Sequence, residues 1–205
     1  MTNRRDFLRA GAAAAGGLAT TASVRAQDGR AAYSAGRMSG DAVANQVRTE
    51  AEGAALFVRG GDGSDGRMRY VLIVTGIRNV TQAHLHRGGE GEQGPVVAWL
   101  YPGPMAREPH RIPGRFDGVL VTGQFRSGDL VGPLEDATLS DLVAAIEDGN
   151  AFVQVHTEGN PAGEIRGQLA VVERSTVQFR NRAEVDVDDG FGFQQSVQLQ
   201  VNEQS

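Results

Sequence analysis

An all-β domain is the fold class that the sequence predicts: a Greek-key β-sandwich or barrel with one short helix. Glycine is frequent, with 28 copies among 205 residues, and short apolar runs alternate with turn-forming residues along most of the chain. Only one segment has the apolar period of a helix. The chain holds no cysteine, so a hydrophobic core and not a disulfide must stabilise the fold.

The first 26 residues are expected to be an export signal. The motif RRDFL at residues 4–8 precedes an Ala/Gly-rich apolar run, as in twin-arginine signals, and residues 24–26 form a small-residue cleavage site. The apolar run contains Arg9 and is too weak to anchor the chain in a membrane. We therefore expect a periplasmic or secreted protein, exported by the twin-arginine route, that begins with a linker over residues 27–37.

The charge balance excludes several partners. The chain has 20 Lys+Arg against 25 Asp+Glu, and the signal removes four arginines and one aspartate, so the mature chain has a net charge of −8. Such a chain is not expected to bind nucleic acid or anionic membranes non-specifically. A serine hydrolase and a nucleotide-binding protein are also unsupported, because G-x-S-x-G and a phosphate-cradling loop between strand and helix are both missing.

Seven segments are expected to be strands, because apolar and β-branched residues cluster in them between turn signals. They are residues 54–58, 70–77, 83–86, 96–101, 118–125, 151–156 and 164–172. Between the first two, the sequence RGGDGSDGR is typical of a hairpin loop.

The helix is expected within DATLSDLVAAIEDGN, residues 136–150. Apolar side chains recur there at i, i+3, i+4 and i+7, namely Leu139, Leu142, Val143 and Ile146. Thr138 and Asp141 form a capping-box pattern, and Gly149 suits the C-terminal end. We expect this helix to close one end of the sandwich.

The character of the sequence changes after the last strand. VQFRNRAEVDVDD and QQSVQLQVN alternate apolar and polar residues around the turn-like DDGFG. Residues 173–205 are therefore expected to be a β-hairpin extension, which covers a sheet edge or makes a subunit contact in a homo-oligomer.

Two of the four histidines, His84 and His86, lie one residue apart on an expected strand. Because side chains alternate between the faces of a strand, both are expected on the face opposite Ala83 and Leu85, which point into the core. The same alternation places His156 off the core. Side chains at i and i+2 lie about 6–7 Å apart, which lets two imidazoles reach one metal ion. Such pairs are also common as ordinary surface residues, and the third histidine favours a metal site.

The residue types restrict the metal. Histidine ligands without cysteine or a closely spaced carboxylate suit copper or zinc and not calcium or magnesium. Copper is the better choice if the function is redox chemistry.

A long connection over residues 102–118, rich in proline and glycine, is expected to cover the histidines. It carries His110, the fourth histidine. The arginines expected near the site are Arg87, Arg107, Arg111, Arg115 and Arg166. Together they would form a positive spot for a small anionic substrate. The alternative is that each arginine pairs with a neighbouring carboxylate.

Three blocks of sequence resemble the CHRD domain. They are AHLHRGGEGEQGPVVAWLY, LSDLVAAIEDGN and FVQVHTEGNPAGEIRGQL. The resemblance covers a domain over residues 38–172 and implies a β-sandwich module, a module whose role is often unknown.

The H-x-H pair, the later V-H and the turn GNPAGEIRG are also similar to copper/zinc superoxide dismutases. That resemblance implies a superoxide dismutase-like, immunoglobulin-like sandwich in which His84, His86, His110 and His156 bind copper. It further implies that Arg166 guides superoxide and that His110 takes part in catalysis by leaving the reduced metal. The chain departs from that family because it lacks cysteine and further histidines, so no separate zinc site is expected.

Two functions of different classes are therefore expected. One is an exported copper-dependent superoxide dismutase, which converts superoxide into dioxygen and hydrogen peroxide. The alternative is a non-catalytic CHRD binding or structural module, or a periplasmic copper-binding protein. Metal analysis of the purified protein separates a purely structural module from the other two.

Overall fold

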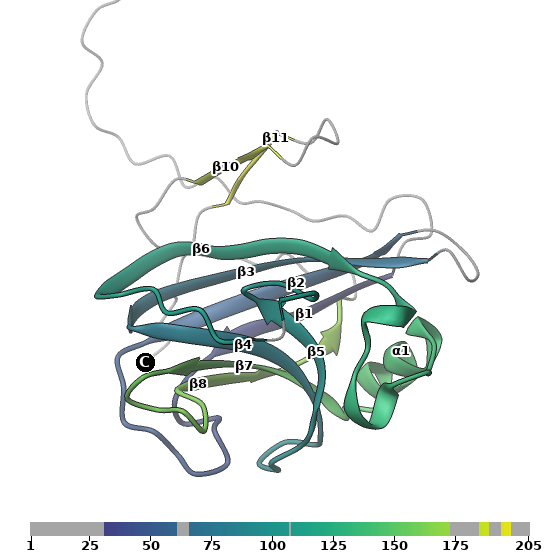
Figure 1. The fold of residues 1–205 in the computed structure, drawn as a ribbon, viewed down its shortest axis with the longest axis horizontal. Helices are drawn as coiled ribbons and strands as arrows, with labels where there is room; N and C mark the ends of the chain where they lie inside the picture. The colour runs from purple at the N-terminus through teal and green to yellow at the C-terminus, as the bar shows by residue number, and fades with distance from the viewer. Residues whose placement is uncertain (1–30, 61–65, 107, 173–184, 189–193, 198–205) are drawn as a thin grey trace, which may run out of the picture.

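Two antiparallel sheets, packed face to face, form the body of the protein (Figure 1). The computed structural model describes residues 31–60, 66–106 and 108–172, together with the backbone of strands at 185–188 and 194–197. The expected export signal lies outside the described residues. The all-β sandwich with one helix is confirmed, and its Greek-key order stays a prediction.

The first sheet has five strands in the order β6-β3-β2-β1-β9. Their bounds are β1 Ala32–Met38, β2 Glu52–Gly60, β3 Arg67–Arg78, β6 Arg115–Phe125 and β9 Ala170–Val171. The second sheet has four strands in the order β5-β4-β7-β8. Their bounds are β4 Val80–Arg87, β5 Val96–Tyr101, β7 Ala151–Thr157 and β8 Ile165–Gln168. In the C-terminal extension, β10 Val185–Asp188 pairs antiparallel with β11 Gln194–Val197.

The structure differs from the sequence-based expectation at two places. The linker expected over residues 27–37 is in part a strand, because β1 pairs with both β2 and β9 and buries Tyr33 and Met38. The strand expected over residues 164–172 is divided into β8 and β9. Leu169 separates the two pieces, which belong to different sheets.

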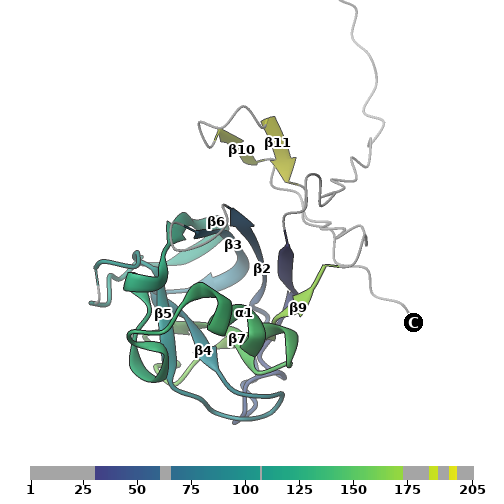
Figure 2. The ribbon, with the colours of Figure 1, turned by 90° about the vertical axis from the view of Figure 1, so that its right-hand side faces the viewer.

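The helix confirms the capping pattern. Helix α1 spans Leu139–Glu147, and Thr138 and Asp141 each bond the other's backbone N–H at its first turn. Gly149 follows with a positive φ of 72°, a conformation that favours glycine. Figures 1 and 2 show α1 at one end of the two layers, where its apolar face joins the core. Two short 3-10 turns, Ser127–Asp129 and Gly132–Leu134, lead into it.

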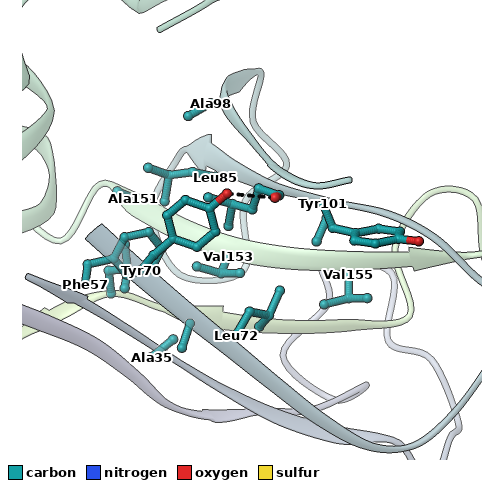
Figure 3. Packing of buried hydrophobic residues seen from close by; sticks show 14 of the residues in the cluster. Ala35, Phe57, Tyr70, Leu72, Leu85, Ala98, Tyr101, Ala151, Val153 and Val155 are labelled. Carbon is teal, nitrogen blue, oxygen red and sulfur yellow. Dashed lines mark hydrogen bonds between the residues drawn. The ribbon is translucent and has the colours of Figure 1, made fainter. Parts of the chain in front are cut away.

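The core lies between the sheets, and a buried hydrogen bond crosses it (Figure 3). Phe57, Tyr70 and Leu72 all come from the first sheet. The Tyr70 hydroxyl donates a hydrogen bond of 2.8 Å to the carbonyl of Leu100 in β5, which belongs to the second sheet. Burial raises the pKa of Tyr70, so the hydroxyl keeps its proton. This bond therefore joins the two sheets within the core.

Among the described residues, no helix has both the length and the apolar character needed to cross a bilayer.

Removing the link between the sheets should destabilise the fold. We expect Tyr70→Phe to lower the free energy of unfolding by about 1–3 kcal/mol, because the buried carbonyl of Leu100 loses its donor. Urea denaturation measures the change. Tyr101→Phe is the matched control, since no hydrogen bond holds the Tyr101 hydroxyl in the described structure. Equal stability of the two variants would contradict the role given to the Tyr70 bond.

Candidate metal centre

His84 and His86 lie on the face of the second sheet that is turned away from the core. Ala83 and Leu85, which alternate with them on β4, are fully buried in the core cluster. The histidines are nevertheless not surface residues, because only 4% of His84 and 6% of His86 is exposed. This second face of the sheet is therefore also covered.

Loops cover this face. The segment between β1 and β2 passes below β8 in Figure 1 and contacts it through a backbone bridge between Ser39 and Arg166. The segment after β4 supplies the carbonyls of Gly88 and Gly94 to side chains of the sheet. Sequence alternation predicted the face correctly, but it carries no information on what packs over that face.

β7 brings the third histidine to the same place. In the register between β4 and β7, Gln82 is opposite His156 and His84 is opposite Gln154, so His156 is a diagonal neighbour of His84. Nδ1 of His84 lies 3.3 Å from Nε2 of His156. One ring nitrogen from each of His84, His86 and His156 falls within 4.8 Å of the others.

Backbone carbonyls set the tautomers of two rings. Nδ1 of His86 lies 2.8 Å from the carbonyl oxygen of Gly94, and Nδ1 of His156 lies 3.0 Å from that of Pro161. A carbonyl only accepts, so each Nδ1 carries the proton and each Nε2 keeps its lone pair. Nε2 of His156 then accepts from Nδ1 of His84.

The site fits a metal ion because two of its ring nitrogens have no hydrogen-bond partner. Nε2 of His84 and Nε2 of His86 are buried and have no hydrogen-bond partner. Nδ1 of His84 and Nε2 of His156 are 3.3 Å apart, which is also the separation of two nitrogens bonded to one tetrahedral ion at about 2.0–2.1 Å, so an ion held by this pair would replace the hydrogen bond between the two rings. The Nδ1–H bonds to carbonyls are the type of support that orients histidine ligands.

The histidines are uncharged. Burial, together with the neighbouring His156 and His86, lowers the pKa of His84 to about 3. Burial also lowers the pKa of His86 to about 4 and shifts the pKa of His156 in the same direction. At neutral pH all three imidazoles are therefore neutral and can donate electron pairs without losing a proton.

Aromatic side chains surround the rings. Trp99 of β5 meets His84 edge-on, with ring centroids 4.3 Å apart. Phe152 stacks on His86 at 4.9 Å with the planes 6° apart. The Arg166 guanidinium carbon lies 3.8 Å from the centroid of Phe152.

Arg166 is a buried residue with fixed partners. Only 2% of it is exposed, and its guanidinium donates to the carbonyls of Ala42 and Gly89 and to the side chain of Gln168. The guanidinium thus presents no open face to solvent. The expected role of Arg166 in guiding an anion stays a prediction.

His110 is not part of this group. Its side chain is exposed, and its backbone N–H donates to the carbonyl of Thr81, which places the loop beside β4 without bringing the ring into the cluster of three. Its expected role as a ligand and in catalysis stays a prediction.

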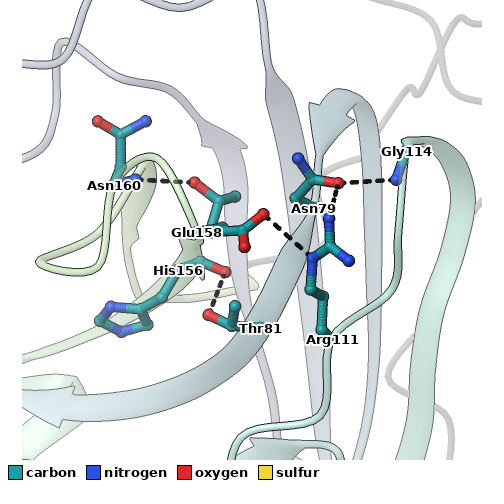
Figure 4. Close-up of polar contacts among 8 residues, drawn as sticks. Asn79, Thr81, Arg111, Gly114, His156, Glu158 and Asn160 are labelled. Carbon is teal, nitrogen blue, oxygen red and sulfur yellow. Dashed lines mark hydrogen bonds and ion pairs between the residues drawn. The ribbon is translucent and has the colours of Figure 1, made fainter.

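The neighbouring arginines pair with acceptors. Arg111 bonds Glu158 and Asn79, and the ring of His156 points away from this group of contacts (Figure 4). Arg115 pairs with Asp117. For these two arginines the alternative of pairing with carboxylates holds, while Arg107 lies outside the described residues. Arg87 is exposed.

Sequence reasoning missed the loop positions that orient the rings. At Gly94, a Cβ atom would collide with the carbonyl of Arg87, so the backbone of this loop can approach β4 only with glycine. The repeated glycines of RGGEGEQG were the available signal. Phe152 had a signal too, because alternation on β7 places it on the face of His156.

The comparisons with known proteins identify the domain. A model of the CHRD domain family matches residues 33–169, which run from β1 to the end of β8 and include all three clustered histidines. No curated protein and no solved structure matches the chain. The resemblance to superoxide dismutases finds no support in these comparisons.

The neutral histidines should make the fold sensitive to acid. Below about pH 6.5 the unfolded chain takes up protons on these residues, whereas the folded protein keeps His84 and His86 neutral until about pH 4. The free energy of unfolding of the metal-free protein should therefore fall as the pH is lowered through this window. The slope is up to about 1.4 kcal/mol per pH unit for each histidine.

Urea denaturation across this window measures the slope, and His86→Gln should reduce it. His110→Gln replaces an exposed histidine outside the cluster and serves as the matched control. A stability that does not depend on pH in this range would contradict the neutral, buried state of the rings.

Proposed function

The chain belongs to the CHRD domain family, and from the three buried imidazoles that this domain brings together we propose that the protein binds a single copper ion. His84, His86 and His156 would hold the ion. The observation that carries the proposal is the pair of buried, unpartnered Nε2 atoms beside a third imidazole. Buried polar atoms without a partner are rare in proteins, and a bound ion would supply the missing partner.

The donor set favours copper. Imidazole nitrogen is a ligand for copper, zinc, iron and nickel, whereas calcium and magnesium require oxygen ligands. Among divalent ions of the first transition row, copper binds nitrogen sites most tightly. Zinc is the competing ion that the experiments below include.

We also propose that the protein acts outside the cytoplasm. The twin-arginine motif at residues 4–8 and the cleavage pattern at residues 24–26 support this location. Detection of the mature chain in a periplasmic fraction tests it.

Copper loading tests the function directly. The mature protein, purified without a histidine tag, should bind one copper ion per chain after desalting, as measured by elemental analysis. The variant His84→Gln/His86→Gln should lose affinity by on the order of 100-fold or more, because two of the three nitrogen ligands are gone.

His110→Gln is the matched control, and it should bind copper like the wild type. Full copper binding by the double variant would refute the proposed site. Loss of binding in His110→Gln would instead make His110 a ligand, as the sequence led us to expect.

Superoxide dismutation is the second candidate function. Three protein ligands would leave a further coordination position of a bound ion open, as catalytic metal sites require. The chain would contribute the fixed ligand geometry and the enclosed surroundings, and the ion would supply one-electron chemistry. Superoxide decay is measured with copper-loaded and metal-free protein after unbound copper is removed. Equal decay rates would exclude dismutation and leave the copper-binding proposal intact.

A further inference from the structure

We propose that this site selects copper(I) over copper(II) and zinc(II), and that the buried charge of Arg166 produces the selection. The inference rests on the proposed function, because it concerns which ion the three histidines hold. It is drawn from the distribution of charge around the rings.

The ligands bring no negative charge. All three are neutral imidazoles, and among the described residues no carboxylate or thiolate joins the group. An ion that binds here therefore keeps its full charge inside the protein. Such a charge is costly to bury unless neighbouring groups compensate it.

A buried charge beside the site has the same sign as the ion. The partners of the Arg166 guanidinium are the carbonyls of Ala42 and Gly89 and the amide oxygen of Gln168, which are all neutral. Within the described part of the chain, no salt bridge involves Arg166, and its Nε has no partner. The charge is thus buried without a carboxylate beside it.

Other charges near the site compensate it weakly. Glu90 and Glu92, on the segment after β4, are exposed, so solvent screens them. Glu164 is buried as well, but its carboxylate is directed at Thr49, Thr157 and Asn160, and among the described residues it pairs with neither Arg166 nor a histidine.

A single aromatic ring separates the cation from the ligand. β7 lies between β4 and β8, and Phe152 is paired with His86 on one side and with Gln168 on the other. Phe152 therefore stands between His86 and Arg166, with the His86 ring centroid at 4.9 Å and the guanidinium carbon at 3.8 Å from its own centroid. No water layer fits within such a stack, so the repulsion is screened less than at a surface.

The repulsion discriminates between ions by charge. A doubly charged ion is repelled by Arg166 twice as strongly as a singly charged one at the same position. Imidazole accepts copper in both oxidation states, so the charge beside the site can decide between them. The site consequently favours the ion of lower charge.

Competition experiments on the mature protein test the selection. Copper(I) affinity is measured without oxygen against the chromophoric chelator bicinchoninate, copper(II) affinity against glycine, and zinc affinity against a colorimetric zinc chelator. We expect the wild type to bind copper(I) more tightly than either divalent ion. Arg166→Met should change the ratio of copper(I) to copper(II) affinity by about tenfold or more in favour of copper(II).

Two further variants isolate the charge. Arg166→Lys keeps a cation at the position and should retain most of the wild-type ratio. Arg37→Met also removes one positive charge, but from an exposed side chain on β1 that pairs with Glu52, and should leave the ratio unchanged. An Arg166→Met ratio equal to that of the wild type would overturn the role of Arg166.

If Arg166→Met does not fold, the affinities of the wild type for the three ions still test the selection. Equal or tighter binding of copper(II) or zinc(II) would overturn the selection while leaving the copper-binding function in place. Absence of stoichiometric binding of copper in either oxidation state would overturn the proposed function itself and the selection with it.

Discussion

Strand β7 is buried on both faces, and this constraint accounts for the arrangement around it. Every residue from Ala151 to Thr157 is withdrawn from solvent. One face supplies Val153 and Val155 to the apolar core. The other face carries Gln154 and His156, whose polar atoms must find partners within the protein. Gln154 donates to the carbonyl of Ala162, and His156 bonds that of Pro161, so the following loop is held by the strand's own side chains.

The second face thereby forms a polar interior, in which buried nitrogen atoms need hydrogen-bond or metal partners. Carbonyls satisfy one nitrogen of His86 and one of His156, but Nε2 of His84 and of His86 remain without a partner. Each unsatisfied buried atom destabilises the folded chain by about 1–3 kcal/mol. A hydrophobic side chain at either position would avoid this cost. The histidines are therefore better explained by something they bind than by packing.

How much could be predicted from the sequence depended on the range of each interaction. The face of His84 and the cap at Thr138 were predictable, because strand alternation and capping involve residues at most three apart. Strand β1 was missed because its small residues give a weak pattern and its pairing depends on β2 and β9. The burial of Arg166 depends on its contacts with Gly89 and Ala42, which lie 77 and 124 positions away in the sequence. No local sequence pattern indicates such contacts. The H-x-H spacing reflects strand geometry, so unrelated sandwiches can share it.

The contacts of Arg166 also determine when the centre can form during folding. The rings come from β4 and β7, while the guanidinium that packs on Phe152 comes from β8 and bonds carbonyls before β2 and after β4. Pairings of such long sequence separation are slow to form, because the loop they close must be ordered first. A chain that ends before β8 has both histidine-bearing strands and lacks this closure. The enclosed site is therefore a property of the completed domain and cannot arise in a folding intermediate built from its first strands alone.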